Sequence, residues 1–203
     1  MLKEEKVKNK NAAIGIMITA SHNPSTWNGI KFKESYGGAA SKEFLEPMES
    51  LIDINQAAGK KPTVGALSGV KRFDPHGEYI QAVGNLVDLK KIRSAGFKVL
   101  FDAMYGAGAG YLEDLMGHQV TTLHGNPDPD FGGIHPEPII PYVNGAIETM
   151  RAGNYSICLI NDGDADRIGA IDENGNYVSS HFIFSLLLKH LVENQNRRGK
   201  VLK

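Results

Sequence analysis

Apolar and polar positions follow two different periods along this chain, and each change of period predicts where a strand gives way to a helix. Residues 12–19 (AAIGIMIT) form a continuous apolar run that is rich in β-branched side chains. Such a run is typical of a strand buried on both faces in a parallel sheet. A polar loop over residues 20–28 and a short alternating strand over 29–33 follow it. The chain is therefore predicted to open with a strand, a loop and a strand.

Two helical patterns come next. Apolar residues recur every three or four positions over 41–58, and a second pattern over 78–92 ends in basic residues. We place a domain boundary at Ser94–Gly96, which gives one domain over residues 1–94 and another over 95–203. Little chain precedes the first strand, so we expect part of the first domain to lie upstream.

The second half of the chain predicts an α/β domain. A strand, a glycine-rich turn (GAGAG), a helix and a strand form a βαβ unit, and we expect the turn to serve tight packing. Further elements follow: a helix over 143–152, strands over 155–160 and 167–171, and a helix from about 180. The predicted fold class is α/β, with two three-layer α/β/α domains built on mixed, mainly parallel sheets, the first domain being incomplete.

Charge and cysteine content narrow the function classes. The 203 residues include 22 basic and 23 acidic ones, so no global field draws the chain to nucleic acid or to an anionic membrane. The single cysteine, Cys158, excludes an intrachain disulfide and a cysteine-based zinc site, and it favours a reducing cytoplasm. The N-terminus lacks an apolar signal region, and no apolar run reaches the length of a membrane span.

The segment NDGDADR, residues 161–167, places carboxylates at alternate positions directly after a buried strand. Three carboxylates that converge on one point repel each other unless a cation neutralises them. Asp162, Asp164 and Asp166 are therefore predicted ligands of a hard, oxygen-binding cation such as Mg²⁺ or Ca²⁺.

Three other interpretations of this loop stay open. It could be a solvated turn whose aspartates bond their own backbone. It could be a non-catalytic Ca²⁺/Mg²⁺-binding module of the EF-hand type, although Arg167 stands where that loop needs glycine and both flanks are strand-like. It could also belong to a phosphatase of the haloacid-dehalogenase type with Asp162 as nucleophile, although such a phosphatase would have Thr or Val at the position of Asp166.

The segment TASHNPSTWNGIK, residues 19–31, puts Ser21 at the exit of the first strand. A serine hydroxyl is a weak nucleophile, so it needs a base or serves as a phosphate carrier whose charge is managed by cations. His22 and Lys31 are an imidazole and a cation available in the same segment. The string is also good turn chemistry, so by itself it is modest support for a site.

Together the strings TASHNP and DGDADR resemble the phosphoserine and metal loops of the α-D-phosphohexomutase family. FDAMYGAG and FGGIHPEP are similar to the same family, more weakly. The resemblance implies that Ser21 carries a phosphate and that one Mg²⁺ ion bridges it to Asp162, Asp164 and Asp166. It also implies that His22 lies in the site, that Lys31 assists proton transfer, and that Arg167 offsets negative charge.

The activity implied is that of an isomerase, an intramolecular phosphotransferase that interconverts hexose 1-phosphate and hexose 6-phosphate through a hexose 1,6-bisphosphate intermediate. The resemblance covers the latter part of the family's first domain and most or all of its second. The sugar-recognition loop of the third domain and the phosphate-binding loop of the fourth are absent, so the hexose stays open among glucose, mannose and glucosamine. We expect the chain alone to bind Mg²⁺ without appreciable turnover and to need the missing domains as partners.

Overall fold

A computed structural model describes residues 13–63, 65 and 68–201. The chain divides into two compact units, one formed by residues 1–19 and 28–74 and the other by residues 20–27 and 75–203. The second unit thus begins before the boundary expected at Ser94–Gly96, because residues of the 75–94 segment pack onto its sheet. Segment 20–27, which carries Ser21, also belongs to the second unit.

The described part of the first unit is a two-stranded sheet and a helix. Strands β1 (Gly15–Ile18) and β2 (Ile30–Lys33) pair antiparallel, and α2 spans Lys42–Ala57. The Ser41 side chain caps α2 by accepting a hydrogen bond from the backbone N–H of Phe44 at 3.3 Å. The helix predicted over 41–58 is confirmed.

The prediction that the first strand lies buried in a parallel sheet is wrong for this structure. The pairing partner of β1 is β2, which runs antiparallel to it, and Ile16 and Ile18 remain 59% and 63% exposed. An apolar run signals burial only where further strands and helices cover it, and among the described residues no third strand pairs with this sheet.

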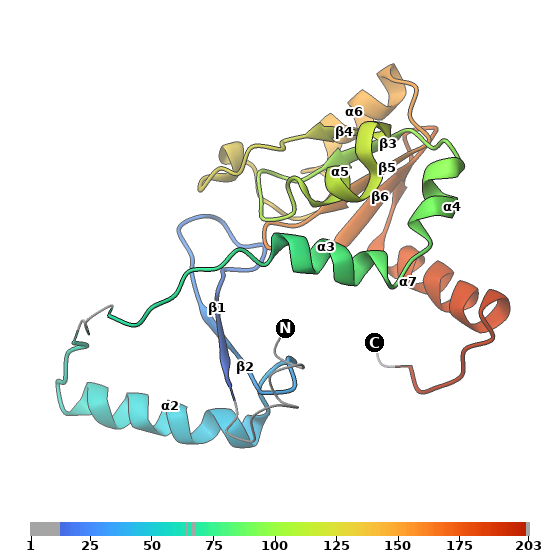
Figure 1. The fold of residues 1–203 in the computed structure, drawn as a ribbon. Helices are drawn as coiled ribbons and strands as arrows, with labels where there is room; N and C mark the ends of the chain where they lie inside the picture. Colours follow the sequence, from blue (N-terminus) through green and yellow to red (C-terminus); the bar gives the residue numbers. More distant parts are fainter. Residues whose placement is uncertain (1–12, 64, 66–67, 202–203) are drawn as a thin grey trace. The chain divides into compact units, whose positions relative to one another are not determined.

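The second unit is a five-stranded mixed sheet in the order β4-β3-β5-β6-β7, drawn in Figure 1. Strand β3 pairs parallel with β4 and β5, whereas β5–β6 and β6–β7 are antiparallel, so parallel and antiparallel pairings are equal in number. The strands are β3 Val99–Asp102, β4 Val120–Leu123, β5 Ile157–Asn161, β6 Ile168–Asp172 and β7 Tyr177–Val178.

Helices cover both faces of this sheet. They are α3 His76–Gly84, α4 Leu89–Ser94, α5 Tyr111–Met116, α6 Asn144–Ala152 and α7 Ser180–Lys189, with short 3₁₀ turns at Gly117–Gln119 and Phe131–Gly133 and a π turn at His190–Asn194. One cluster joins Leu100, Cys158 and Ile160 to Met150 of α6, and a second joins Val99 and Leu115 to residues of α3 and α4. The predicted three-layer α/β/α architecture is confirmed for this unit.

The prediction of a single helix over 78–92 is wrong in one respect, because two helices occupy this stretch. The chain leaves α3 at Gly84, and the Asp88 side chain starts α4 by accepting a hydrogen bond from the backbone N–H of Lys91 at 2.9 Å. Asparagine and aspartate compete with helical hydrogen bonding, so Asn85 and Asp88 favour a break that the apolar spacing conceals.

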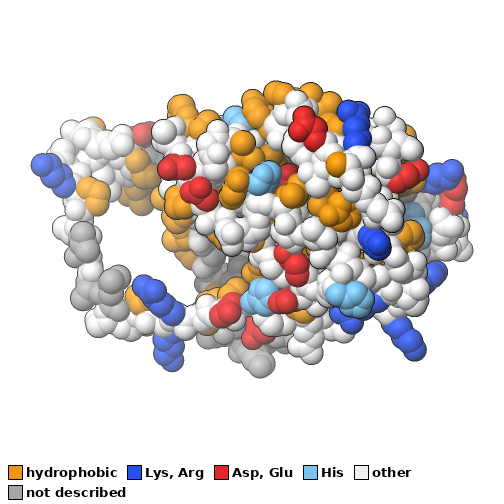
Figure 2. Space-filling view, turned by 90° about the horizontal axis from the view of Figure 1, so that it is seen from above, with side chains coloured by type: hydrophobic (Ala, Val, Ile, Leu, Met, Phe, Trp, Pro, Cys, Tyr) orange, Lys and Arg blue, Asp and Glu red, His pale blue; other side chains and the backbone are white. Residues whose placement is uncertain are grey.

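The visible surface carries mixed charge. Figure 2 shows Lys and Arg side chains interspersed with Asp and Glu side chains, with hydrophobic side chains between them. Within the described part of the chain, no helix combines the length and the apolar character needed to cross a bilayer.

We predict that Leu100→Ala lowers the free energy of unfolding by about 3 kcal/mol. The Leu100 side chain extends from β3 and is fully buried in the cluster that includes Met150 of α6, so its loss leaves a cavity. Leu86→Ala is the matched control, since Leu86 is 83% exposed and its truncation should change stability by less than about 0.5 kcal/mol. Urea unfolding followed by circular dichroism measures both. Equal losses in the two variants would contradict this assignment of the core.

Candidate active site

The acidic segment forms the loop between β5 and β6, at the edge of the sheet where β5 ends. Carboxylate oxygens of Asp162, Asp164 and Asp166 all lie within 4.8 Å of one another. Asp162 is fully buried, Asp164 is half-buried and Asp166 is exposed, so the cluster opens from the protein interior toward solvent. The predicted convergence of the three aspartates is therefore present in the folded chain.

The buried aspartate organises this loop. Oδ1 of Asp162 accepts hydrogen bonds from the backbone N–H groups of Asp166 at 2.9 Å and Arg167 at 3.0 Å. The backbone N–H of Ala165 donates to the carbonyl oxygen of Asp162 at 3.1 Å, and Ala165 adopts a φ of 59°. A left-handed alanine is costly, so the surrounding hydrogen bonds must hold the loop in this shape.

Burial makes the ionised form of Asp162 energetically unfavourable. It raises the pKa of this carboxyl to about 6; the N–H of Arg167 opposes the shift, and the neighbouring charges of Asp164 and Asp166 add to it. Oδ2 of Asp162 is buried and accepts no hydrogen bond from any described residue, and Nε of Arg167 lies 3.7 Å away. A buried carboxylate with two further carboxylates close to it fits a hard divalent cation.

The glycine-rich turn packs directly against this loop. Strands β3 and β5 are parallel neighbours, so the segments that follow them leave the sheet at the same edge. The backbone N–H of Ala107 donates to the carbonyl oxygen of Gly163 at 3.0 Å. A Cβ at Gly106 would lie 2.4 Å from that same oxygen, so the turn needs glycine there for close backbone approach.

The serine loop, residues 20–27, is part of the same compact unit. Ser21 adopts a φ of 58°, a left-handed conformation that is uncommon for a residue other than glycine and is concentrated at functional sites. Nδ2 and the backbone N–H of Asn23 both donate to the carbonyl oxygen of Ala20, at 3.0 and 3.1 Å, which closes the turn around Ser21. Nδ1 of His22 lies 3.4 Å from Oγ of Ser21.

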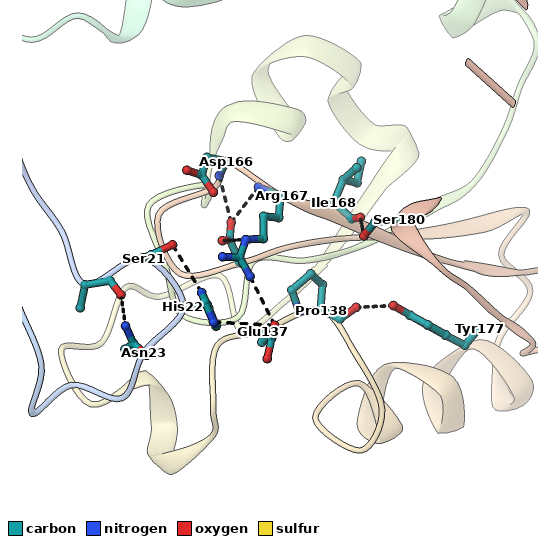
Figure 3. A network of polar contacts seen from close by, with 12 residues as sticks. Ser21, His22, Asn23, Glu137, Pro138, Asp166, Arg167, Ile168, Tyr177 and Ser180 are labelled. Atoms are coloured by element: carbon teal, nitrogen blue, oxygen red, sulfur yellow. Dashed lines mark hydrogen bonds and ion pairs between the residues drawn. The ribbon is translucent and has the colours of Figure 1, made fainter. Parts of the chain in front are cut away.

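A polar network connects the serine loop to the acidic loop through Glu137, as Figure 3 shows. Oε1 of Glu137 lies 3.8 Å from Nε2 of His22 and 3.3 Å from a terminal guanidinium nitrogen of Arg167. The structure thus brings together Ser21, His22, Arg167 and the three aspartates within one unit. Lys31 lies on β2 in the first unit, and its part in the site stays a prediction.

Glu137 is a residue of this network that the sequence pattern alone does not single out. It lies in the segment FGGIHPEP, whose resemblance to the phosphohexomutases assigns no role to any one residue. The signal that could have found it is a charged residue held between two prolines in a loop, since rigid loops position functional groups.

Comparison with protein families gives two matches. The profile of the phosphoglucomutase/phosphomannomutase α/β/α domain I matches residues 5–58, and that of α/β/α domain II from the same proteins matches residues 77–175. The second match contains the complete acidic loop and the Glu137 segment, and the first contains the serine loop.

Relatives differ in the sugar that their names indicate. A "Probable phosphoglucosamine mutase" of Thermococcus kodakarensis is 32% identical over 97% of this chain, and a phosphopentomutase of the same organism is 34% identical over 91%. The chain spans only 42% and 40% of these two proteins. A crystal structure named as a candidate phosphomannomutase of Thermus thermophilus superposes with a TM-score of 0.81 at 28% identity, covering 97% of this chain and 45% of that one.

We predict that Mg²⁺ raises the melting temperature of the chain at about pH 7.5 and does so much less at about pH 5. Below about pH 6 the Asp162 carboxyl is protonated, so the cation must first displace a proton.

Without metal, stability should change with pH in the opposite direction. The pKa of Asp162 is raised in the folded chain, so ionising this carboxyl lowers the free energy of unfolding as pH rises from about 4 to about 6. Thermal melts with and without Mg²⁺ measure both effects.

Asp164→Asn should weaken Mg²⁺ binding about tenfold, or about 1.4 kcal/mol, because a neutral amide replaces a carboxylate ligand. Asp53→Asn makes the same change on the exposed surface of α2 and should leave Mg²⁺ binding unaltered. Titration calorimetry gives the affinities. Indistinguishable affinities for these two variants would contradict a metal site at the acidic loop.

Proposed function

Because the chain belongs to the α-D-phosphohexomutase family, we propose that it supplies the phosphate-carrying and metal-binding part of a sugar-phosphate mutase. The observation that carries this proposal is that the serine loop and the acidic loop occur in one compact unit and are linked there through Glu137. Ser21 and Asp162 lie far apart in the sequence, and the contacts through Glu137 join their loops in one polar network (Figure 3).

In the proposed reaction, Ser21 carries a phosphoryl group and gives it to a free hydroxyl of a hexose monophosphate. The bond between phosphorus and Oγ of Ser21 breaks, a bond between phosphorus and the sugar oxygen forms, and the sugar hydroxyl loses its proton while Oγ gains one. The resulting hexose 1,6-bisphosphate turns around and returns its other phosphoryl group to Ser21. His22, with Nδ1 3.4 Å from Oγ, is suited to hold a proton at the serine oxygen.

Asp162, Asp164 and Asp166, together with the phosphate on Ser21, would hold one Mg²⁺ ion. When bound, this ion supplies positive charge that stabilises the transferring phosphoryl group. Three carboxylates and a phosphate of nearly two negative charges exceed one divalent cation by roughly three charges. Arg167, within 3.7 Å of Asp162, therefore offsets part of that excess, and Lys31 is proposed to do so as well.

The sugar is proposed to be a hexose monophosphate. The names of the relatives indicate glucosamine, mannose and pentose phosphates, so similarity to them supports the reaction type more than a particular sugar. Those proteins are more than twice as long as the stretch they share with this chain, and we propose that their additional domains provide the contacts that orient the sugar. Positioning accounts for much of the catalysis in phosphoryl transfer, so these contacts matter as much as Ser21.

The alternatives have less support. An EF-hand joins two helices, whereas the acidic loop joins the antiparallel strands β5 and β6, which does not favour the EF-hand interpretation. For a phosphatase with Asp162 as nucleophile, one carboxylate oxygen would have to attack phosphorus. Oδ1 of Asp162 already accepts two backbone hydrogen bonds and Oδ2 is buried, which does not favour that role.

We predict that prolonged incubation with excess glucose 1,6-bisphosphate and Mg²⁺ adds one phosphoryl group to the chain, on Ser21, because one slow transfer per chain suffices and no repeated turnover is needed. Ser21→Ala should abolish the added mass, whereas Ser25→Ala, a matched change in the same loop, should retain it. Intact-mass and peptide-mass measurements give the extent and the position. Phosphate on Asp162, or none on the wild-type chain, would contradict the proposal.

The chain alone should convert glucose 1-phosphate to glucose 6-phosphate at a negligible rate, even when Ser21 is phosphorylated, because residues that orient the sugar are proposed to lie in other domains. A coupled assay for glucose 6-phosphate measures the rate, with a full-length mutase as the positive control. Turnover comparable to that control would show that the chain is sufficient for catalysis.

A further inference from the structure

Glu137 is held by a well-anchored segment, His135–Pro138. The two prolines that flank it, Pro136 and Pro138, are fully buried. The carbonyl oxygen of Pro136 accepts a hydrogen bond from the backbone N–H of Gly163 in the acidic loop at 3.1 Å, and that of Pro138 accepts one from the hydroxyl of Tyr177 on β7 at 2.7 Å. Proline restricts the backbone, so the segment presents the Glu137 carboxylate with little freedom.

One oxygen of this carboxylate faces both neighbours. Oε1 lies 3.3 Å from Arg167 and 3.8 Å from His22, and Nε of Arg167 in turn lies 3.7 Å from Oδ2 of Asp162. Figure 3 shows His22 and Arg167 reaching Glu137 from two different loops. Glu137 is 23% exposed at its side chain, which leaves these contacts only partly screened by water.

A carboxylate that contacts His22, the neighbour of a serine that is to carry phosphate, is electrostatically unfavourable, because the two negative charges repel each other. Some other interaction of Glu137 should therefore outweigh this repulsion, and its contacts with His22 and Arg167 indicate which one. We propose that Glu137 is a positioning residue, which holds the His22 ring beside Oγ of Ser21 and the Arg167 guanidinium beside Asp162. This inference rests on the proposed function, in which both groups serve phosphoryl transfer at Ser21.

The first test does not depend on that function. Nitrogen-15 NMR follows hydrogen exchange of the Arg167 guanidinium N–H groups in the unphosphorylated chain, comparing Glu137→Ala and Glu137→Gln with the wild type. Glu137→Ala should accelerate exchange about tenfold, because the guanidinium loses its anchor, and Glu137→Gln, which keeps the shape without the charge, should have an intermediate effect. Glu148→Ala, on the exposed side of α6, is the control and should not change it.

The second test measures how fast glucose 1,6-bisphosphate loads phosphate onto Ser21. Glu137→Ala should slow loading by about tenfold to a hundredfold, with Glu137→Gln between it and the wild type and Glu148→Ala unchanged. Unaltered Arg167 exchange or unaltered loading in Glu137→Ala overturns the positioning role. If the wild-type chain is not loaded at all, the proposed function fails instead, and the exchange measurement still decides whether Glu137 holds Arg167.

Discussion

The concentration of negative charge at the end of β5 is the constraint on which the rest of the site depends. Asp162 is fully buried, its neighbours Asp164 and Asp166 converge on the same point, and burial raises its pKa to about 6. The protein meets part of this cost with backbone N–H groups and with Arg167. The remaining imbalance is the reason why we propose that this loop binds a divalent cation.

Short local segments of sequence made the geometry of the acidic loop predictable. Asp162, Asp164 and Asp166 are close in sequence and follow a strand, so their convergence depends on a short loop alone. The βαβ unit and α6 were predictable for a similar reason, since their apolar periods match the faces that they bury. The break between α3 and α4 was missed because apolar spacing continues across Asn85 and Asp88.

Features that depend on distant parts of the chain could not be predicted. The pairing of β1 depends on which strands lie beside it, and its apolar composition suggested a buried parallel strand that the described residues do not form. The contacts of Glu137 with His22 and Arg167 form only when the chain folds, because both residues lie far from Glu137 in the sequence. No local pattern contains that relation.

The central claim is that the serine loop and the acidic loop form one site, and the coupling between phosphate and metal tests it most directly. Titration calorimetry should compare the Mg²⁺ affinity of the chain with and without phosphate on Ser21. One site predicts that phosphorylation raises the affinity at least about tenfold, because the phosphate adds a charged ligand, and linkage makes the effect reciprocal. Equal affinities in the two forms would contradict it.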